Sequence, residues 1–336
     1  MSDSGVLGSL FRFRSPNVYL PVLFLLILAA IPILAPDPVI LRIFYFTFWY
    51  AFFAGSWHIL GRYAGQLSIG HAAFFGIGAY VTTLLLEYFG ITPWAGMFLG
   101  AALAAGVAIL IGFPCFRLRG LYYALITLAF GEVVRIILLT WKGVTHGPLG
   151  IFIPHIGDSL FYFQFTSKVP YYYSMLALML VLIFVLIRIE RSKLGFYLAA
   201  IREDEDAATS LGVNAFKYKL IAAGISAFFA ALAGFFYINY LFYIDPYDVN
   251  IMRSIDPVII SFVGGSSAFG PIIGSFILTP IAEVLTIMLG GKMPILRHIA
   301  YGSILIVVLL TIPEGLSTPI LRAYNSLVRK LSRSGE

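Results

Sequence analysis

Residues 171–189 read YYYSMLALMLVLIFVLIRI, a run of 19 residues in which Arg188 is the one charged side chain. A helix of roughly 20 mostly apolar residues crosses the hydrocarbon core of a bilayer, which is about 30 Å thick. A strand of a membrane barrel would instead alternate apolar and polar residues. The run therefore predicts a transmembrane helix.

Similar runs recur along nearly the whole chain. Of its 336 residues, 60% are hydrophobic and 11% are charged, which is more apolar surface than a soluble core of this length can bury. Lipid offers backbone groups no hydrogen-bond partners, so helices must form the spans. We predict an all-α, polytopic membrane helical bundle of about ten spans: 18–35, 39–60, 66–89, 94–115, 119–140, 171–189, 217–244, 254–268, 270–290 and 295–313.

The basic residues predict the orientation of this bundle. With the N-terminus in the cytoplasm, 15 of the 22 Lys and Arg fall on the cytoplasmic side and the other seven lie outside or at the outer ends of spans. This asymmetry is the positive-inside pattern. We therefore expect a cytoplasmic tail over 1–17, a transmembrane domain over 18–315 and a basic cytoplasmic tail over 316–336.

Several classes of function are disfavoured. The net charge of +6 comes from basic residues scattered at the ends of apolar runs, so it reflects membrane topology and not a nucleic-acid surface. The single Cys115 offers neither a disulfide nor a cysteine metal site. No GxxxxGK[ST] motif is present, so ATP would have to be bound by partner subunits. We expect no enzymatic activity, no metal and no cofactor in this chain.

The loop that follows residue 189, over 190–216, contains the acidic stretch IREDEDAATSLGVN. Acidic residues are favoured in the first turn of a helix, and glycine is favoured just after the last. The stretch therefore predicts a helix over 203–211 that ends at Gly212. Such a helix is too short to persist alone in water, so it needs a surface to pack against.

This predicted helix presents Ala207, Ala208 and Leu211 as a small apolar face, which fits a groove on another protein. The alternative is a helix that lies on lipid headgroups. That arrangement would require a basic polar face, and this one is acidic. A docking helix for a protein partner is therefore favoured.

The segment before residue 171 is a second long loop, 141–170, which reads WKGVTHGPLGIFIPHIGDSLFYFQFTSKVP. Its mixture of glycine, proline and aromatic residues suits a lid or docking face outside the membrane. A passive connector with short interfacial helices explains the same composition, and both interpretations stay open.

Two glycine-rich segments, GQLSIGHAAFFGIGAY at 65–80 and GGSSAFG at 264–270, are unsuited to helices that face lipid. Such clusters permit broken helices that line a cavity, and breaks at corresponding places in two halves predict an inverted repeat. Small residues can also serve tight helix packing alone. The candidate translocation path consists of Gly65, Gln66, Ser68, Gly70, His71, Gly264, Gly265, Ser266, Ser267 and Gly270.

Ionisable residues inside the predicted spans are few. Glu132 and Arg135 lie three apart on one helix face and are expected to form an intramembrane ion pair, with a structural role favoured over substrate contact. Glu283 lies near the middle of its span, and the sequence names no partner for it. His71 is expected to be a hydrogen-bonded packing residue, and His58 to lie at the membrane interface.

The run LGFYLAAIREDEDAATSLGVNAFKYKLIAAGISAFFAALAG resembles the cytoplasmic coupling loop of the permease subunits of branched-chain amino acid ABC transporters, the LivM-type family. Further similarity lies in GQLSIGHAAFFGIGAY, in FRLRGLYYALITLAFGEVVRI at 116–136 and in SFVGGSSAFGPIIGS at 261–275. These segments occur in the family order, and the resemblance covers about residues 40 to 315.

The resemblance implies that the loop helix sits in a cleft of a cytoplasmic ATPase. It carries over to Glu203, Glu205, Ala207, Ala208 and Gly212, and we include Arg202 and Leu211 in the candidate coupling site. It also implies a second permease subunit, two ATPases and an extracytoplasmic substrate-binding protein, with ATP-driven uptake of leucine, isoleucine and valine. Urea or short amides as substrates, or a secondary transporter that works alone, remain alternatives, and a homodimer is not excluded.

Overall fold

The computed structural model describes residues 16–118, 120–288, 294–312, 315–320 and 322–324. Its longer helices are α2 (Pro16–Leu34), α3 (Pro38–His58), α4 (His71–Phe89), α5 (Pro93–Cys115), α6 (Leu121–Thr140), α8 (Val169–Glu190), α11 (Ala215–Leu241), α12 (Ile251–Gly264), α13 (Gly270–Met288) and α14 (Pro294–Thr311). Its short elements are η1 (Ile59–Tyr63), α7 (Lys142–Thr145), η2 (Gly147–Leu149), β1 (Ile151–Phe152), α9 (Lys193–Glu203), α10 (Glu205–Ser210), β2 (Tyr243–Ile244) and η3 (Pro246–Val249).

The all-α, polytopic membrane bundle is confirmed, and each of the ten predicted spans coincides with a helix. Within the described residues, seven helices are long and apolar enough to cross a membrane: α3 with η1, α4, α5, α6, α8, α11 and α13. Helix α12 has only 14 residues, and the span predicted there, 254–268, is the shortest of the ten. Helices α2 and α14 each border an undescribed stretch of the chain.

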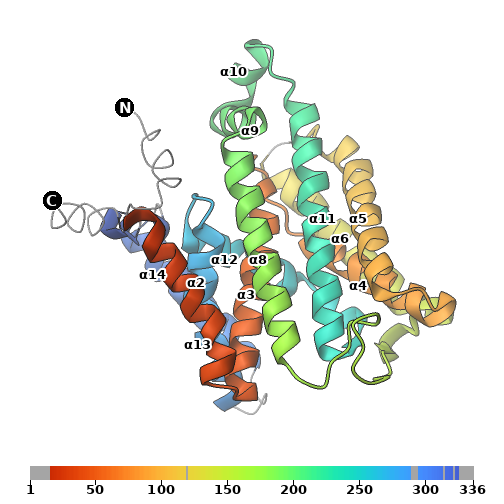
Figure 1. Ribbon diagram of the computed structural model, residues 1–336. Helices are drawn as coiled ribbons and strands as arrows, with labels where there is room; N and C mark the ends of the chain where they lie inside the picture. Colours follow the sequence, from red (N-terminus) through yellow and green to blue (C-terminus); the bar gives the residue numbers. More distant parts are fainter. Residues whose placement is uncertain (1–15, 119, 289–293, 313–314, 321, 325–336) are drawn as a thin grey trace.

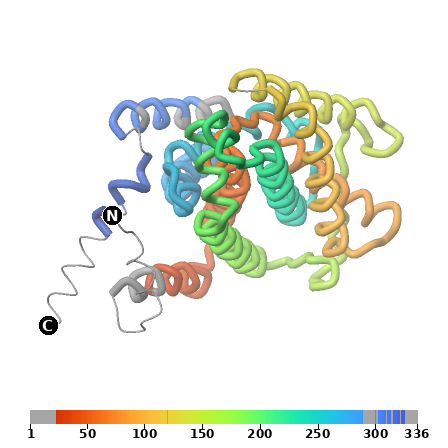
Figure 2. The backbone as a smooth tube through the Cα atoms, turned by 90° about the horizontal axis from the view of Figure 1, so that it is seen from above, coloured from red at the N-terminus to blue at the C-terminus, as the bar shows by residue number. Residues whose placement is uncertain are grey.

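Helices α3 and α11 form the centre of the bundle, and the other helices surround them (Figures 1 and 2). The aromatic run of α3 is buried here and does not face lipid. The phenol of Tyr45 donates to the carbonyl of Phe236 at 2.7 Å, and the indole of Trp49 donates to the carbonyl of Ala233 at 2.8 Å. Each large ring thus has both apolar neighbours and a partner for its polar atom.

Helix α11 crosses α4 so closely that only glycine fits at two positions. A Cβ added to Gly78 would lie 2.2 Å from the carbonyl oxygen of Ala231, and one added to Gly234 would lie 2.2 Å from that of Phe75. Small residues allow membrane helices to approach in this way. Helices α4 and α11 are therefore held together by direct contact between their backbones.

The two long loops lie at opposite ends of the bundle (Figure 1). Helices α9 and α10 extend beyond the ends of α8 and α11, and we call this the α10 end. Residues 141–168 cover the other end, which we call the loop end. There β1 pairs antiparallel with β2, with Ile151 opposite Ile244. This two-stranded sheet, with two residues in each strand, thus connects the long loop to the residues that follow α11.

Candidate functional site

The acidic stretch forms a corner at the α10 end, between α9 and α11. Asp204 has an extended backbone (φ −155°, ψ 109°), and its side chain accepts hydrogen bonds at 2.9 Å from the amides of Asp206 and Ala207. It is therefore the N-cap that starts α10. The single helix predicted over 203–211 is wrong in this respect, because Glu203 ends α9 and a new helix begins at Glu205.

The three residues of the predicted docking face, Ala207, Ala208 and Leu211, do not share one exposed surface. Ala208 is buried at 3% exposure in a small cluster with Ile201 and Ala215 of the same chain, so a bulky residue there would clash inside this corner. Ala207 is exposed, and Leu211 is 86% exposed. Leu211 and the acidic side chains are thus the part of the corner that a partner can reach, with Gly212 (φ +87°) closing the turn behind them.

A buried ion pair fastens α10 to the span α11. The ammonium nitrogen of Lys219 lies 2.6 Å from a carboxylate oxygen of Glu205, and the Lys219 side chain is 1% exposed. The sequence placed Lys219 only among the charges that mark the cytoplasmic side. A lysine four residues inside an apolar helix could have suggested a buried partner, but nothing in the sequence pointed to Glu205. The pair gives α10 a direct contact with α11.

Arg202 connects the same corner to the first glycine-rich segment, which begins at Gly65. Its guanidinium donates to the carbonyl of Arg62 in η1 at 3.1 Å and also pairs with Glu203 at 2.6 Å. Gly65 follows η1 with φ +67°, and an added Cβ would lie 2.8 Å from Cγ of Arg202. Arg202 therefore packs against its own chain as well as facing outward, and α9 lies directly over the start of the predicted path.

The two predicted glycine breaks are irregular segments, residues 64–70 between η1 and α4, and residues 265–269 between α12 and α13. They lie close together, because the indole of Trp57 donates to the carbonyl of Ser68 at 2.8 Å and Nε2 of the adjacent His58 lies 3.3 Å from the Ser266 carbonyl. Nδ1 of His58 is also 2.7 Å from the Ser261 hydroxyl. His58 is fully buried within the protein, and its predicted level at the membrane interface stays a prediction. The histidine joins the end of α3 to the end of α12.

Helices α3 and α12 run in the same direction, since Tyr50 bonds Asp256 at 3.2 Å while His58 contacts Ser261. The two breaks therefore follow parallel helices and lie toward the same end of the bundle, the α10 end. In an inverted repeat, corresponding breaks would follow antiparallel helices and lie toward opposite ends. These two breaks therefore do not provide the correspondence on which the predicted inverted repeat rested.

Most of the predicted path residues pack against neighbouring backbone. Ser68, Gly70, His71, Gly264, Gly265 and Gly270 are buried, whereas Gly65 and Ser266 are exposed and Gln66 and Ser267 are half-buried. A Cβ on Gly70 would lie 2.1 Å from the carbonyl oxygen of Thr127. Nε2 of His71 lies 3.4 Å from the Ser56 hydroxyl and 3.3 Å from that of Ser226, which confirms its role as a hydrogen-bonded packing residue.

Gly264→Ala is expected to destabilise the turn between α12 and α13 by about 1–3 kcal/mol or more, the range for overpacking a tight site. An added Cβ would lie 1.8 Å from the carbonyl oxygen of Gly270, and backbone cannot rotate away as a side chain can. Thermal unfolding in detergent measures the change. The matched control is Gly302→Ala, where an added Cβ meets nothing within 4 Å; equal effects of the two variants would contradict the packing explanation.

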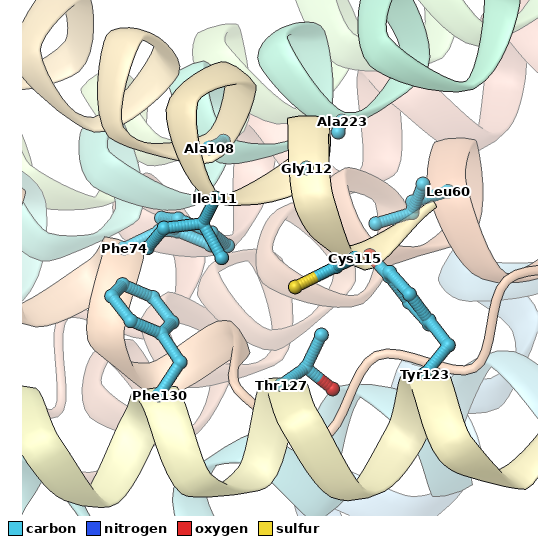
Figure 3. Close-up of a pocket in the computed structure, with 10 residues that line it drawn as sticks. All are labelled: Leu60, Phe74, Ala108, Ile111, Gly112, Cys115, Tyr123, Thr127, Phe130 and Ala223. Carbon is cyan, nitrogen blue, oxygen red and sulfur yellow. The ribbon is translucent and has the colours of Figure 1, made fainter. Parts of the chain in front are cut away.

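Glu132 and Arg135 pair on α6, with Nε of Arg135 lying 3.1 Å and 3.0 Å from the two Glu132 carboxylate oxygens. Glu132 also lines a cavity of about 120 Å³ beside the first break, together with Ile69, Asn250 and Ser254. By contrast, the apolar crevice between α5 and α6 in Figure 3 offers about 10 Å³, no more than one water needs. The larger cavity is thus the candidate with room for part of a small solute.

Two further polar clusters lie toward the loop end, and the sequence did not predict them. Arg253 donates to the hydroxyl of Tyr237 at 2.8 Å and to that of Tyr50 at 3.1 Å, and it lies 3.0 Å from the carboxylate of Asp248. The cluster ties η3 and α12 to α3 and α11. Glu283, for which the sequence named no partner, lies 3.4 Å from Nε of Arg42.

The loop end is an ordered surface with apolar side chains facing outward. The indole of Trp94 donates to the carbonyl of Leu160 at 2.9 Å, which fixes the middle of the loop on α5. Hydrogen bonds from Thr166 hold the pKa of Asp158 below its usual value and close the loop on itself. Leu149, Phe152, Leu160 and Phe161 are nevertheless exposed, so the loop presents an apolar face of its own.

Within the described part of the chain, no group of three or more His, Cys, Asp or Glu side chains is placed to hold a metal ion. The polar clusters found here are ion pairs and hydrogen-bonded packing groups. The candidate site consists of the corner around α10 at one end of the bundle, the two glycine breaks and the cavity beside the first break.

Similarity to known proteins covers most of the chain. A family described as branched-chain amino acid transport system / permease component matches residues 39–312. The high-affinity branched-chain amino acid transport system permease protein LivM of Escherichia coli (strain K12) is 34% identical over an alignment of 262 residues, which covers 68% of this chain and 61% of that protein. The protein of the same name from Salmonella typhimurium (strain LT2) has the same identity and coverage.

A more distant relative is TsgC13 of Haloferax volcanii, provisionally named a glucose ABC transporter permease. It is 27% identical over an alignment of 198 residues, which covers 54% of this chain and 56% of that protein. No solved structure matches the chain. The chain spans 61% of the length of the two LivM proteins, and the family match extends from α3 to the end of α14. The chain belongs to the branched-chain amino acid transport system permease family.

Proposed function

We propose that this chain is the membrane subunit of an ATP-driven importer and forms the translocation path for branched-chain, neutral aliphatic amino acids. Two cytoplasmic ABC ATPases would bind the α10 end, a second permease subunit would pair with this one in the bilayer, and a substrate-binding protein would dock at the loop end. This arrangement places both termini in the cytoplasm of a bacterial cell, with the chain in the inner membrane.

The observation that carries the proposal is the construction of the α10 corner. It combines an exposed Leu211, an acidic first turn and a buried ion pair from Glu205 to Lys219 that leads into α11. In a stand-alone transporter no partner would bury the leucine that is exposed on this corner. A corner built in this way favours a protein partner that binds it and displaces it.

The buried neighbours of this corner support a mechanical role. Arg202 lies over the segment that begins at Gly65, and Lys219 lies near the start of α11, the helix whose Gly234 packs on α4. A displacement of α10 would therefore move η1 and α11 together, on either side of the first break. Interfaces of this kind pass from one packed arrangement to another instead of deforming continuously.

Leu211→Ser is expected to weaken association with the ATPase pair by roughly tenfold to a hundredfold, since burial of a leucine side chain contributes about 1.5–3 kcal/mol. The fold should be unaffected because this side chain is 86% exposed. Co-purification and titration with the ATPases measure the change. Ser210→Ala, at the neighbouring exposed position, is the matched control, and unchanged affinity in Leu211→Ser would count against a docking corner.

A further inference from the structure

Helix α6 combines the least buried span with a pair of charges near its middle. Only 17% of its most apolar window is buried, compared with 78% for α11. Glu132 and Arg135 are the twelfth and fifteenth of its 20 residues, so the pair lies close to mid-membrane. Their side chains are 43% and 23% exposed.

Exposure to lipid does not explain this placement. Ionisable residues in membrane spans are costly against hydrocarbon, and they face a bundle interior or a water-filled cavity. The structure provides such a cavity at Glu132, with a volume of about 120 Å³. Glu132 therefore borders a space that a polar solute can enter, and Arg135 is joined to this border through its hydrogen bonds to Glu132.

The walls of this cavity are of two kinds. Ile69, Val249 and Ile251 supply apolar surface, whereas Asn250 and Ser254 supply polar atoms near Glu132. Ser254 is already held in place, because its hydroxyl accepts from the amide of Ala72 at 2.9 Å. The cavity can thus receive a small aliphatic group while a charged group stays at its edge, on α6.

We propose that Glu132, Arg135 and this cavity form a mid-membrane binding site for a zwitterionic α-amino acid with an aliphatic side chain. The carboxylate of Glu132 accepts hydrogen bonds from the substrate ammonium, and the guanidinium of Arg135 donates to the substrate carboxylate. The aliphatic side chain enters the space between Ile69 and Ile251. This inference rests on the proposed transport of amino acids and names the residues that would contact the substrate.

Exchange of ion pairs makes such a site reversible. Without substrate the two side chains neutralise each other, and with substrate each one meets the opposite charge of the zwitterion. The site and the ligand are both neutral overall, so no net charge is added to the membrane interior. Charge-assisted bonds of this kind are stronger than neutral ones. Urea and sugars carry no opposite charges and could not replace the internal pair.

Neutral variants provide the first test, in the assembled transporter in vesicles. Glu132→Gln and Arg135→Gln should each lower leucine uptake by roughly tenfold to a hundredfold, the range for loss of a hydrogen bond to a charged group. The exchanged variant, Glu132→Arg with Arg135→Glu, keeps an ion pair on α6 and so keeps its structural contribution. Uptake should remain low in the exchanged variant, and full recovery would show that the pair only stabilises the helix.

A labelling experiment tests binding directly. Cys115 is the one cysteine of the chain, so Cys115→Ser gives a background for reporters at the cavity, Ile251→Cys and Leu128→Cys. At leucine about tenfold above its dissociation constant, mass action leaves about a tenth of the sites open, so maleimide labelling of the reporters should slow about tenfold. Leu125→Cys, exposed on α6 outside the cavity, should label at an unchanged rate.

Ligands that lack one charge complete this test. Isoamylamine has no carboxylate and 4-methylpentanoate has no ammonium, so neither should protect the reporters at the same concentration. ATP-driven uptake by the reporter variants tests the transport function separately. Uptake without protection, or equal protection by all three ligands, would overturn the binding site while leaving the transport proposal standing.

Discussion

Glu205→Ala is expected to lower the free energy of unfolding by about 3 kcal/mol, because it leaves the ammonium of Lys219 buried without its counter-charge. The two charged groups are 2.6 Å apart, and the Lys219 side chain is 1% exposed. An uncompensated buried charge costs more than the pair itself contributes. Thermal unfolding of the purified chain in detergent measures the loss.

Two controls separate this explanation from a general effect of removing an acid. Glu203→Ala removes a 74% exposed carboxylate from the same corner and should change stability by less than about 0.5 kcal/mol. The double variant Glu205→Ala with Lys219→Met removes both charges and should regain most of the lost stability. Equal effects of Glu203→Ala and Glu205→Ala would contradict the buried pair.

The same variants also test the mechanical role of the corner. If α10 drives α11 through this ion pair, the double variant should fold and bind the ATPases but couple hydrolysis to uptake poorly. ATP consumed per leucine transported should therefore rise. An unchanged ratio would show that the pair fixes the fold without transmitting movement.

Arg253→Met is expected to have a destabilising effect of similar size, about 3–5 kcal/mol, by breaking a buried charge network. The guanidinium lies 3.0 Å from Asp248 and donates to the hydroxyls of Tyr237 and Tyr50. Its removal leaves the Asp248 carboxylate, a group only 19% exposed, without its cation. Thermal unfolding in detergent again measures the change.

A second substitution and a matched arginine sharpen this prediction. Asp248→Asn in the Arg253→Met background removes the uncompensated charge and should recover part of the stability. Arg202→Met breaks a pair whose remaining carboxylate, Glu203, is 74% exposed, so it should cost less than Arg253→Met. The opposite order would contradict the assignment of Arg253 to a buried network.

The helices themselves could be predicted from the sequence, because a transmembrane helix leaves a long apolar run with few charges. The existence of a helix with an acidic first turn, ending just before Gly212, followed as well. What could not be predicted is the division at Asp204. Whether an acidic residue continues a helix or caps a new one depends on the backbone angle set by α9 and α11, which meet only in the folded chain.

The direction of individual side chains was equally beyond the sequence. Ala207 and Ala208 look alike in the motif, yet Ala208 is buried against Ile201 and Ala215 while Ala207 is exposed. Which alanine faces the partner depends on the fold of the whole corner. Periodicity within one short helix cannot distinguish the side that packs on its own chain from the side that packs on another protein.

The contacts that the sequence prediction missed most were those of charged residues near the ends of spans. Lys219 and Arg253 lie near the ends of spans, and each holds a polar contact: the Lys219 side chain is 1% exposed and that of Arg253 is 14% exposed. Their partners come from elsewhere in the fold, such as Tyr50 at a separation of 203 residues from Arg253. A single sequence contains no signal for such pairs, whereas the i, i+3 spacing of Glu132 and Arg135 made their pairing predictable.

Uptake of radiolabelled leucine by vesicles tests the central claim most directly. The vesicles would contain this chain, its permease partner and the two ATPases, with the binding protein supplied at the loop end. We predict uptake that requires ATP inside the vesicles, is abolished by an inactive ATPase and is strongly reduced by Leu211→Ser. Uptake that persists without ATP and follows a proton or sodium gradient would contradict the proposal and identify a secondary transporter.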